Sequence, residues 1–233
     1  MTVRTSATRR PHLRVVGVIT SCADLDSAIR MRHPPDLFEL RLDHLVGVID
    51  EVEEKILQLN SPLIITARHP QEGGANKLSL RQRRNLLTRF LPYAKYVDVE
   101  LRSAFAMHAL LTLADQRKVR RIISFHNFKS TTTPRILSAK ARAAKVHRAS
   151  IFKLATRTDT PVQLARLLSF ITNEKVDLPV SAMGIGKLGA ISRLLLARAG
   201  SVLVYASIAG RTGVEGQLSL EQLRALGFAP LKR

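Results

Sequence analysis

The chain has 233 residues, 45% of them hydrophobic and 24% charged, so it can bury a sizeable core and fits one large α/β domain. It contains no run of about 20 apolar residues, which argues against a membrane-spanning helix. Its one cysteine, Cys22, excludes an internal disulfide framework and a multi-cysteine metal site. Because the N-terminus lacks the apolar core of a signal peptide, we expect a cytoplasmic protein without membrane contacts.

The charge is strongly basic, with 37 Lys and Arg against 18 Asp and Glu, a net charge of +19. Between Gln116 and Thr158 there are twelve basic residues and no acidic one. Such a field attracts nucleic acid and equally a small anionic substrate. Aromatic residues are only 5%, and the basic residues of 135–148 alternate with apolar ones as on a solvated helix face. We therefore expect no specific nucleic-acid partner.

Short apolar runs alternate with segments that have helical periodicity. The runs predict eight strands, at 13–20, 37–42, 63–67, 96–101, 122–125, 151–155, 180–183 and 202–206. The clearest helical segments are 79–93, 104–116, 134–147, 161–173 and 190–199. This order predicts a parallel sheet, and eight units favour a closed (β/α)8 TIM barrel over an open doubly wound sheet. We expect a single barrel domain over 13–233 and a flexible basic tail over 1–12.

Polar residues end most of the predicted strands. In a barrel these ends meet at the face where active sites lie, so they predict one convergent polar pocket. The residues in question are Glu39 and Arg41 on the second strand, Arg68 on the third, Glu100 and Arg102 on the fourth, His126 on the fifth, Lys153 late in the sixth, Gly184 and Gly186 after the seventh, and Ser207 after the eighth.

Lys153 lies in the apolar run Ser150-Ile151-Phe152-Lys153-Leu154-Ala155. Burial disfavours the charged form of a lysine, so a lysine in such a run can supply the free amine that attacks a ketone. The alternative is a strand lysine that reaches solvent or pairs with a carboxylate. The polar residues at the other strand ends favour the nucleophile.

Several motifs occur together in this chain: Glu39-Leu40-Arg41-Leu42-Asp43, Arg68 with Glu72-Gly73-Gly74, Ser124-Phe125-His126-Asn127-Phe128, Phe152-Lys153, Met183-Gly184 with Ser192-Arg193, and Gly216-Gln217. From about Val15 to the C-terminus the set resembles the type I 3-dehydroquinate dehydratase family. The resemblance implies a barrel enzyme of the shikimate pathway that removes water from 3-dehydroquinate through a lysine imine. It also implies a homodimer that uses no metal and no cofactor.

The chemistry of the residues agrees with this resemblance. An imine formed on Lys153 would withdraw electrons from the adjacent carbon, so that a proton on this carbon becomes removable and a β-hydroxyl can leave as water. The proton needs a base that titrates near neutral pH, and His126 ends the strand before the lysine. The resemblance makes Glu72 the acidic partner that orients the histidine. Taken alone, a glutamate in a Gly-rich loop such as Glu72 is more often a plain surface residue.

The resemblance also implies the substrate contacts. Glu39, Arg41 and Arg68 match positions that bind the ring hydroxyls, although they could instead form a structural ion-pair network. Arg193 lies near the start of a helix and is expected to bind the substrate carboxylate. Gln217 belongs to the closing loop.

The closing loop departs from the family pattern Ser-Ala-Pro-Gly-Gln, because here it reads Gly213-Val214-Glu215-Gly216-Gln217. Gly213 removes a hydroxyl contact and Glu215 replaces a stiffening proline, so we expect weaker substrate affinity with the chemistry intact.

Gly184-Ile185-Gly186-Lys187-Leu188-Gly189 matches the pattern G-x-G-x-x-G. No acidic residue follows at about 20 positions, as a dinucleotide site requires, so we interpret these glycines as allowing close backbone approach.

Three other functions remain open from the sequence. A class I aldolase or a transaldolase-like lyase would share the barrel and the imine lysine but would cleave a carbon–carbon bond. The chain could be a dehydroquinase-like binding protein with a degenerate closing loop. It could also hold nucleic acid through the basic segment 117–157.

Overall fold

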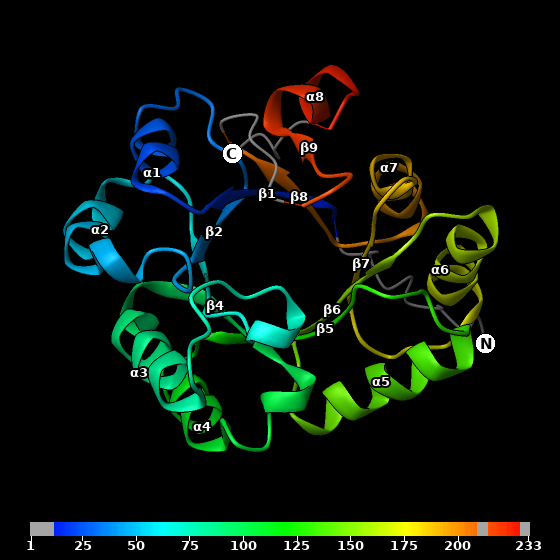
Figure 1. Cartoon of the computed structure of the whole chain (residues 1–233), viewed down its shortest axis with the longest axis horizontal. Helices are drawn as coiled ribbons and strands as arrows, with labels where there is room; N and C mark the ends of the chain where they lie inside the picture. Colours follow the sequence, from blue (N-terminus) through cyan, green and yellow to red (C-terminus); the bar gives the residue numbers. More distant parts are fainter. Residues whose placement is uncertain (1–11, 209–213, 229–233) are drawn as a thin grey trace, which may run out of the picture.

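The computed structural model describes residues 12–208 and 214–228. Parallel strands form a ring, and helices surround it (Figure 1). The strands are β1 (Arg14–Ile19), β2 (Leu37–Arg41), β3 (Leu63–Thr66), β4 (Ala94–Glu100), β5 (Arg120–Asn127), β6 (Ile151–Arg157), β7 (Val180–Ile185), β8 (Leu203–Ser207) and β9 (Leu218–Ser219). The helices are α1 (Cys22–Ile29), α2 (Ile49–Lys55), α3 (Leu80–Phe90), α4 (His108–Gln116), α5 (Pro134–Val146), α6 (Pro161–Asn173), α7 (Gly189–Ala199) and α8 (Leu220–Ala225).

The strand order is β7-β6-β5-β4-β3-β2-β1-β8-β9, with parallel pairing throughout. In the described part of the chain no ladder joins β7 to β8. This seam is closed by the Val202 N–H, which donates to the Val180 carbonyl at 2.9 Å. The Ser201 hydroxyl also accepts from the Ala182 N–H at 3.1 Å. The predicted single α/β barrel is confirmed.

Each of the eight predicted strands overlaps an observed one, within one to two residues at most ends. The two-residue strand β9 was not predicted. It pairs Leu218 and Ser219 with the end of β8, just after the closing loop. The predicted tail over 1–12 lies outside the described residues except for its last residue.

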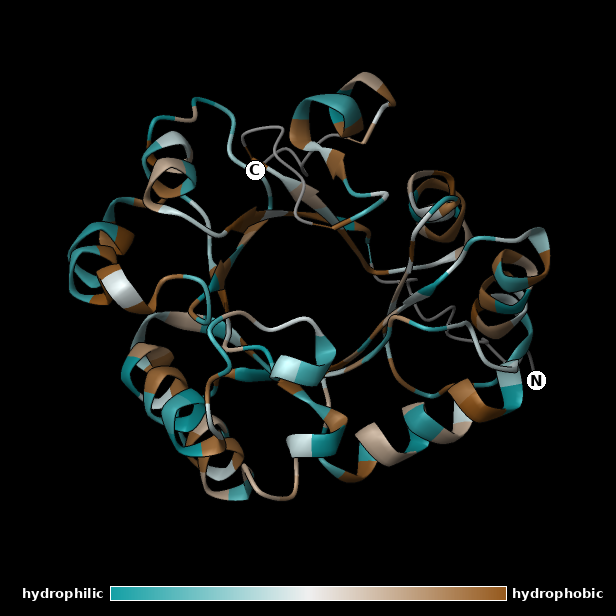
Figure 2. Cartoon of the chain, in the orientation of Figure 1, coloured by the Kyte–Doolittle hydropathy of each residue, from teal (hydrophilic) through white to brown (hydrophobic). Residues whose placement is uncertain are grey.

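Four of the described helices, α1, α3, α6 and α8, begin at a residue whose side chain caps them. Ser79, Thr160 and Ser219 each form a capping box with a glutamine three residues later, which satisfies N–H groups that would otherwise lack a partner at the start of α3, α6 and α8. The helices carry both hydrophobic and hydrophilic residues (Figure 2), and their buried residues pack against the outside of the ring. No described helix is long and apolar enough to cross a membrane.

Side chains alternate between the two faces of the strands, and this alternation separates two cores. On β4, Val97 and Val99 pack toward the helices, whereas Tyr96 joins an apolar cluster inside the ring. Asp98 and Glu100 share the inward face with Tyr96 and are buried. The interior of the barrel is therefore apolar near the starts of the strands, which we call the lower barrel. The polar residues gather toward the carboxyl ends of the strands, in the upper barrel.

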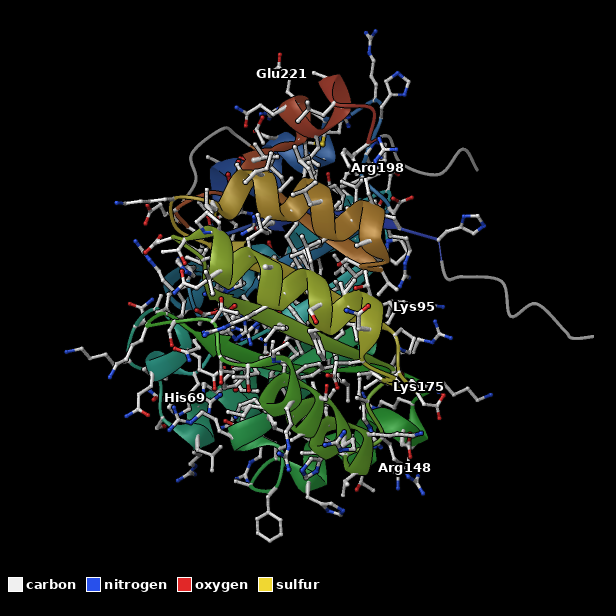
Figure 3. The ribbon with its side chains drawn as sticks, turned by 90° about the vertical axis from the view of Figure 1, so that its right-hand side faces the viewer. His69, Lys95, Arg148, Lys175, Arg198 and Glu221 are labelled. Carbon is white, nitrogen blue, oxygen red and sulfur yellow. The ribbon has the colours of Figure 1, made fainter. Side chains whose placement is uncertain are left out.

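All strands of the ring run in one direction, so their carboxyl ends share one face. In the side view, His69, which follows β3, lies on the left (Figure 3). Lys95, Arg148 and Lys175, which lie at or before the starts of β4, β6 and β7, are on the right. The polar residues of the upper barrel thus face the side marked by His69, where active sites of this fold lie.

Candidate active site

Lys153 is the third residue of β6 and lies deep in the barrel, not late in the strand as predicted. Its neighbours Phe152 and Leu154 point to the helices, because they have the opposite parity on the strand. The lysine is 4% exposed. Its apolar sequence surroundings therefore say nothing about what its amine contacts.

The Lys153 amine lies among charged groups. Nζ donates to Oε1 of Glu39 at 2.8 Å and to Oδ2 of Asp98 at 3.1 Å, and it lies 4.0 Å from the ring centre of Tyr205. The alternative left open from the sequence, a lysine paired with a carboxylate, is therefore observed, and an aromatic ring face also contacts the nitrogen. Any nucleophilic role must start from this ion-paired state.

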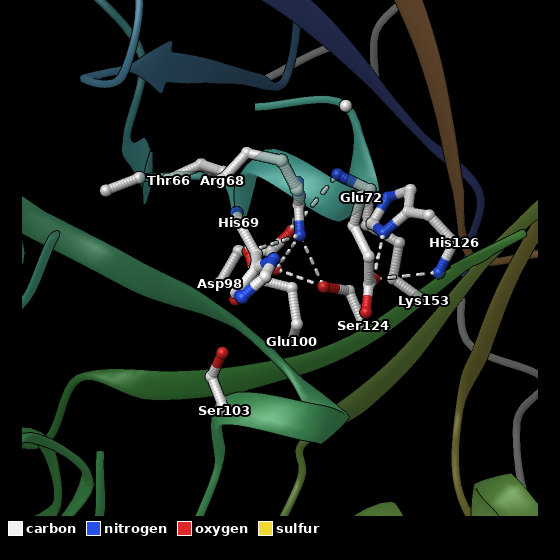
Figure 4. A network of polar contacts seen from close by, with 12 residues as sticks. Thr66, Arg68, His69, Glu72, Asp98, Glu100, Ser103, Ser124, His126 and Lys153 are labelled. Atoms are coloured by element: carbon white, nitrogen blue, oxygen red, sulfur yellow. Dashed lines mark hydrogen bonds and ion pairs between the residues drawn. The ribbon is translucent and has the colours of Figure 1, made fainter. Parts of the chain in front are cut away.

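Arg68 links two buried carboxylates (Figure 4). It forms two bonds with Asp98, at 2.8 and 3.1 Å, and one with Oε1 of Glu100 at 3.3 Å. Arg83 binds the other oxygen of Glu100 at 2.8 Å. The structural network expected as the alternative role of Arg68 is present, and the side chain also lines the pocket.

His126 and Glu72 form a buried pair. Glu72 ends the short 3-10 helix Pro70–Glu72, and its Oε2 lies 3.0 Å from both the backbone nitrogen and ring Nδ1 of His126. Burial, helped by nearby Glu100, raises the pKa of Glu72 to about 7. Burial and the positive charges of Arg68 and Lys153 lower the pKa of His126 well below its ordinary value. The ring is therefore neutral near pH 7, and Nε2 is left for another partner.

Arg193, on α7, has no carboxylate partner in the described parts of the chain. Its Nε donates to the Gly216 carbonyl at 3.0 Å, and its Nη1 lies 3.3 Å from the Met183 sulfur. Burial without a compensating acid lowers the pKa of Arg193 to about 10. A buried, unpaired guanidinium that lines a pocket is suited to bind a carboxylate ligand.

The segment that carries Gln217 packs tightly on the start of α7. A Cβ on Gly189 would lie 2.9 Å from the Cα of Gly216, so both glycines are needed for this backbone contact. Glu215 pairs with Arg157 at 2.9 Å. The carboxylate expected to loosen the closing loop therefore anchors the described part of it, whereas Gly213 lies outside the described residues.

Eight of the nine predicted site residues line one pocket, which contains about 540 Å³ of space free of atoms when its open mouth is included. This size suits a small molecule. The eight are Glu39, Arg41, Arg68, Glu72, His126, Lys153, Arg193 and Gln217. Arg41 also binds Asp43 at 2.8 Å and the Gly73 carbonyl at 3.1 Å.

Some residues at the pocket were not predicted, and five of the predicted strand-end residues do not line it: Glu100, Arg102, Gly184, Gly186 and Ser207. Tyr205 and Met183 line the pocket, and Asp98 lies beneath it. The parity of β4 could have identified Asp98, since it is two residues before Glu100. Arg102 is exposed in the 3-10 turn after β4 and does not join the pocket. The described residues contain no cluster of three or more His, Cys, Asp or Glu side chains that could hold a metal ion.

Comparisons with known proteins agree with this architecture. The sequence model of the type I 3-dehydroquinase family matches residues 16–228. A relative from Methanocella arvoryzae, 3-dehydroquinate dehydratase, is 32% identical over 212 residues, covering 90% of this chain and 93% of the relative.

Two solved structures show the same fold. 3-Dehydroquinate dehydratase from Aquifex aeolicus VF5 superposes with a TM-score of 0.76 at 28% identity, covering 91% of this chain and 96% of that one. The enzyme of the same name from Geobacillus kaustophilus HTA426 gives a TM-score of 0.81 at 22% identity, covering 92% and 90%. By its sequence over almost the whole barrel, the chain belongs to the type I 3-dehydroquinase family.

Proposed function

We propose that this enzyme dehydrates 3-dehydroquinate to 3-dehydroshikimate in the shikimate pathway, through a Schiff base on Lys153 with His126 as general acid and base. One observation carries the proposal: an amine and an imidazole, both nearly buried, line the same small pocket. Family membership supports the substrate and the overall reaction.

The reaction begins when Nζ of Lys153 attacks the ketone carbon and the ketone oxygen leaves as water. The resulting iminium withdraws electrons from the adjacent carbon, so Nε2 of His126 can take a proton from it. The electron pair of that C–H bond forms the new double bond and expels the β-hydroxyl, which leaves as water with the proton from His126. Hydrolysis of the imine then releases the conjugated product and restores the amine.

The other pocket residues are assigned to substrate binding. Arg193 binds the carboxylate, since it has no ion-pair partner in the described structure. Glu39, Arg41, Arg68 and Gln217 surround the ring hydroxyls, and Gly213 occupies the position of the family serine. None of these steps requires a metal or a cofactor.

Activity should rise with pH through about 7, the pKa of Glu72. Below this pH the protonated carboxyl donates to Nδ1 of His126, so the ring proton lies on Nε2, where a lone pair is needed. Above it, ionised Glu72 accepts from Nδ1–H and Nε2 can act as the base. We expect Glu72→Gln to flatten this acidic limb in a profile of kcat/KM against pH. A limb that survives the substitution unchanged would assign the titration to another group.

Restoring the family serine at Gly213 should tighten substrate binding. A neutral hydrogen bond contributes about 0.5–1.5 kcal/mol, so Gly213→Ser is expected to lower KM by up to about tenfold with little change in kcat. Steady-state kinetics on both proteins measure this. An unchanged KM would show that the absence of the serine hydroxyl does not weaken substrate binding in this enzyme.

Product analysis separates this function from its alternatives. Incubation with 3-dehydroquinate should give a single product that has lost one water, detected by mass spectrometry. An aldolase or transaldolase-like lyase would yield two carbon fragments from its own substrate. A dehydroquinase-like binding protein would return the substrate unchanged while still showing saturable binding.

We propose a cytoplasmic location, which the single cysteine suits, and, on the family resemblance, a homodimer, so light scattering should give twice the chain mass of 25.9 kDa. A mass of one chain would contradict the dimer.

We propose no specific nucleic-acid partner, and any binding of DNA or RNA should weaken steeply as the salt concentration rises. Sequence preference that survives at physiological salt would overturn this.

A further inference from the structure

Two carboxylates hold the Lys153 nitrogen, but they are anchored differently. The Asp98 side chain is fully buried and does not line the pocket. Its Oδ1 accepts from the Ser124 hydroxyl at 2.6 Å, and both of its oxygens accept from Arg68. These contacts fix the Asp98 carboxylate in one orientation, as Figure 4 shows.

Glu39 is held less firmly. Its Oε1 accepts from the Thr66 hydroxyl at 2.9 Å, and Arg68 lies farther away, at 3.9 Å. Unlike Asp98, Glu39 lines the pocket and can reach a bound ligand. The two acids therefore differ in freedom and in access to substrate.

Counting hydrogens on the nitrogen separates their roles, if the Lys153 imine of the proposed function forms. The ammonium has three N–H groups, enough to serve both carboxylates. In its condensation with the ketone, one C–N double bond forms, the C–O double bond breaks, and the water that leaves carries two of these hydrogens. The iminium keeps the positive charge but only one N–H. One carboxylate must lose its hydrogen bond to this nitrogen.

We infer that Asp98 is the positioning residue that keeps the Lys153 nitrogen through imine formation, whereas Glu39 gives up its contact and turns to a substrate hydroxyl. Asp98 then also stabilises the iminium charge from a fixed position. The inference rests on the proposed function and assigns a task to a residue that does not line the pocket.

The test compares Asp98→Asn with Glu39→Gln, since each substitution removes one charge with little change in shape. Rapid mixing with 3-dehydroquinate and quenching with borohydride measures how fast the imine forms, and product absorbance measures turnover. At saturating substrate, Asp98→Asn should slow adduct formation by at least about tenfold with KM little changed. Glu39→Gln should raise KM by about tenfold and form the adduct at nearly the wild-type rate.

A third variant guards against misfolding of Asp98→Asn. Ser124→Ala removes one anchor of Asp98 without changing charge, and should slow adduct formation severalfold at unchanged KM. An adduct rate equal to wild type in Asp98→Asn or Ser124→Ala, or a slow adduct in Glu39→Gln alone, would overturn the inference while leaving the proposed function intact. A wild-type protein that forms neither adduct nor product would overturn both.

Discussion

Lys153→Ala is expected to abolish turnover of 3-dehydroquinate. The substitution removes the nitrogen that forms the imine, and no other described lysine lines the pocket. The conjugated enone of the product absorbs in the near ultraviolet and the substrate does not, so absorbance follows the reaction directly. Wild-type enzyme should produce a steady rise in absorbance, and the variant should produce none.

Folding must be separated from chemistry in this experiment. Removing Lys153 leaves Glu39 and Asp98 facing each other without their shared cation, and breaking a buried pair in this way costs about 3–5 kcal/mol. Lys153→Arg keeps the positive charge but cannot supply a free amine, so it should fold and remain inactive. Lys187→Ala, at an exposed lysine in the loop before α7, serves as the control and should keep full activity. Residual activity in Lys153→Arg would exclude the imine.

His126→Ala should have the second largest effect. General acid–base catalysis contributes about 10²–10⁴-fold, so we expect kcat to fall by at least about a hundredfold. Imine formation needs only the amine and the ketone, so the adduct should still form and accumulate. Intact-protein mass spectrometry after borohydride reduction should show a larger adduct fraction in the variant than in the wild type during turnover.

The matched control is His69→Ala. His69 lies at the same end of the barrel, but its ring accepts from the Gln71 backbone N–H and does not line the pocket. This variant should retain the wild-type rate. An equal loss in both variants would mean that His126 acts through the local structure and not as the base.

Strand parity explains why most of the site could be predicted from sequence. The position of a residue within its strand determines whether it faces the barrel interior or the helices, so Lys153, His126, Glu39 and Arg68 could be placed together before any contact was known. Strand parity also explains why the apolar neighbours of Lys153 did not indicate its surroundings. They face the helices, whereas the lysine faces the barrel interior.

The partners of these residues depend on the register between neighbouring strands, which the sequence does not specify. Register and the barrel curvature bring Asp98 to Lys153, 55 positions away along the chain. Among the described residues, Arg193 on α7 has no carboxylate partner, whereas Arg68 contacts both Asp98 and Glu100. The exposed position of Arg102 reflects a 3-10 turn that begins one residue after β4 ends, a boundary too fine for sequence patterns.

Borohydride trapping with peptide mapping tests the central claim most directly. Wild-type protein mixed with 3-dehydroquinate and reduced during turnover should carry one ligand adduct, on the peptide that contains Lys153. An adduct on a different lysine, or turnover that proceeds without any adduct, would contradict the proposed mechanism.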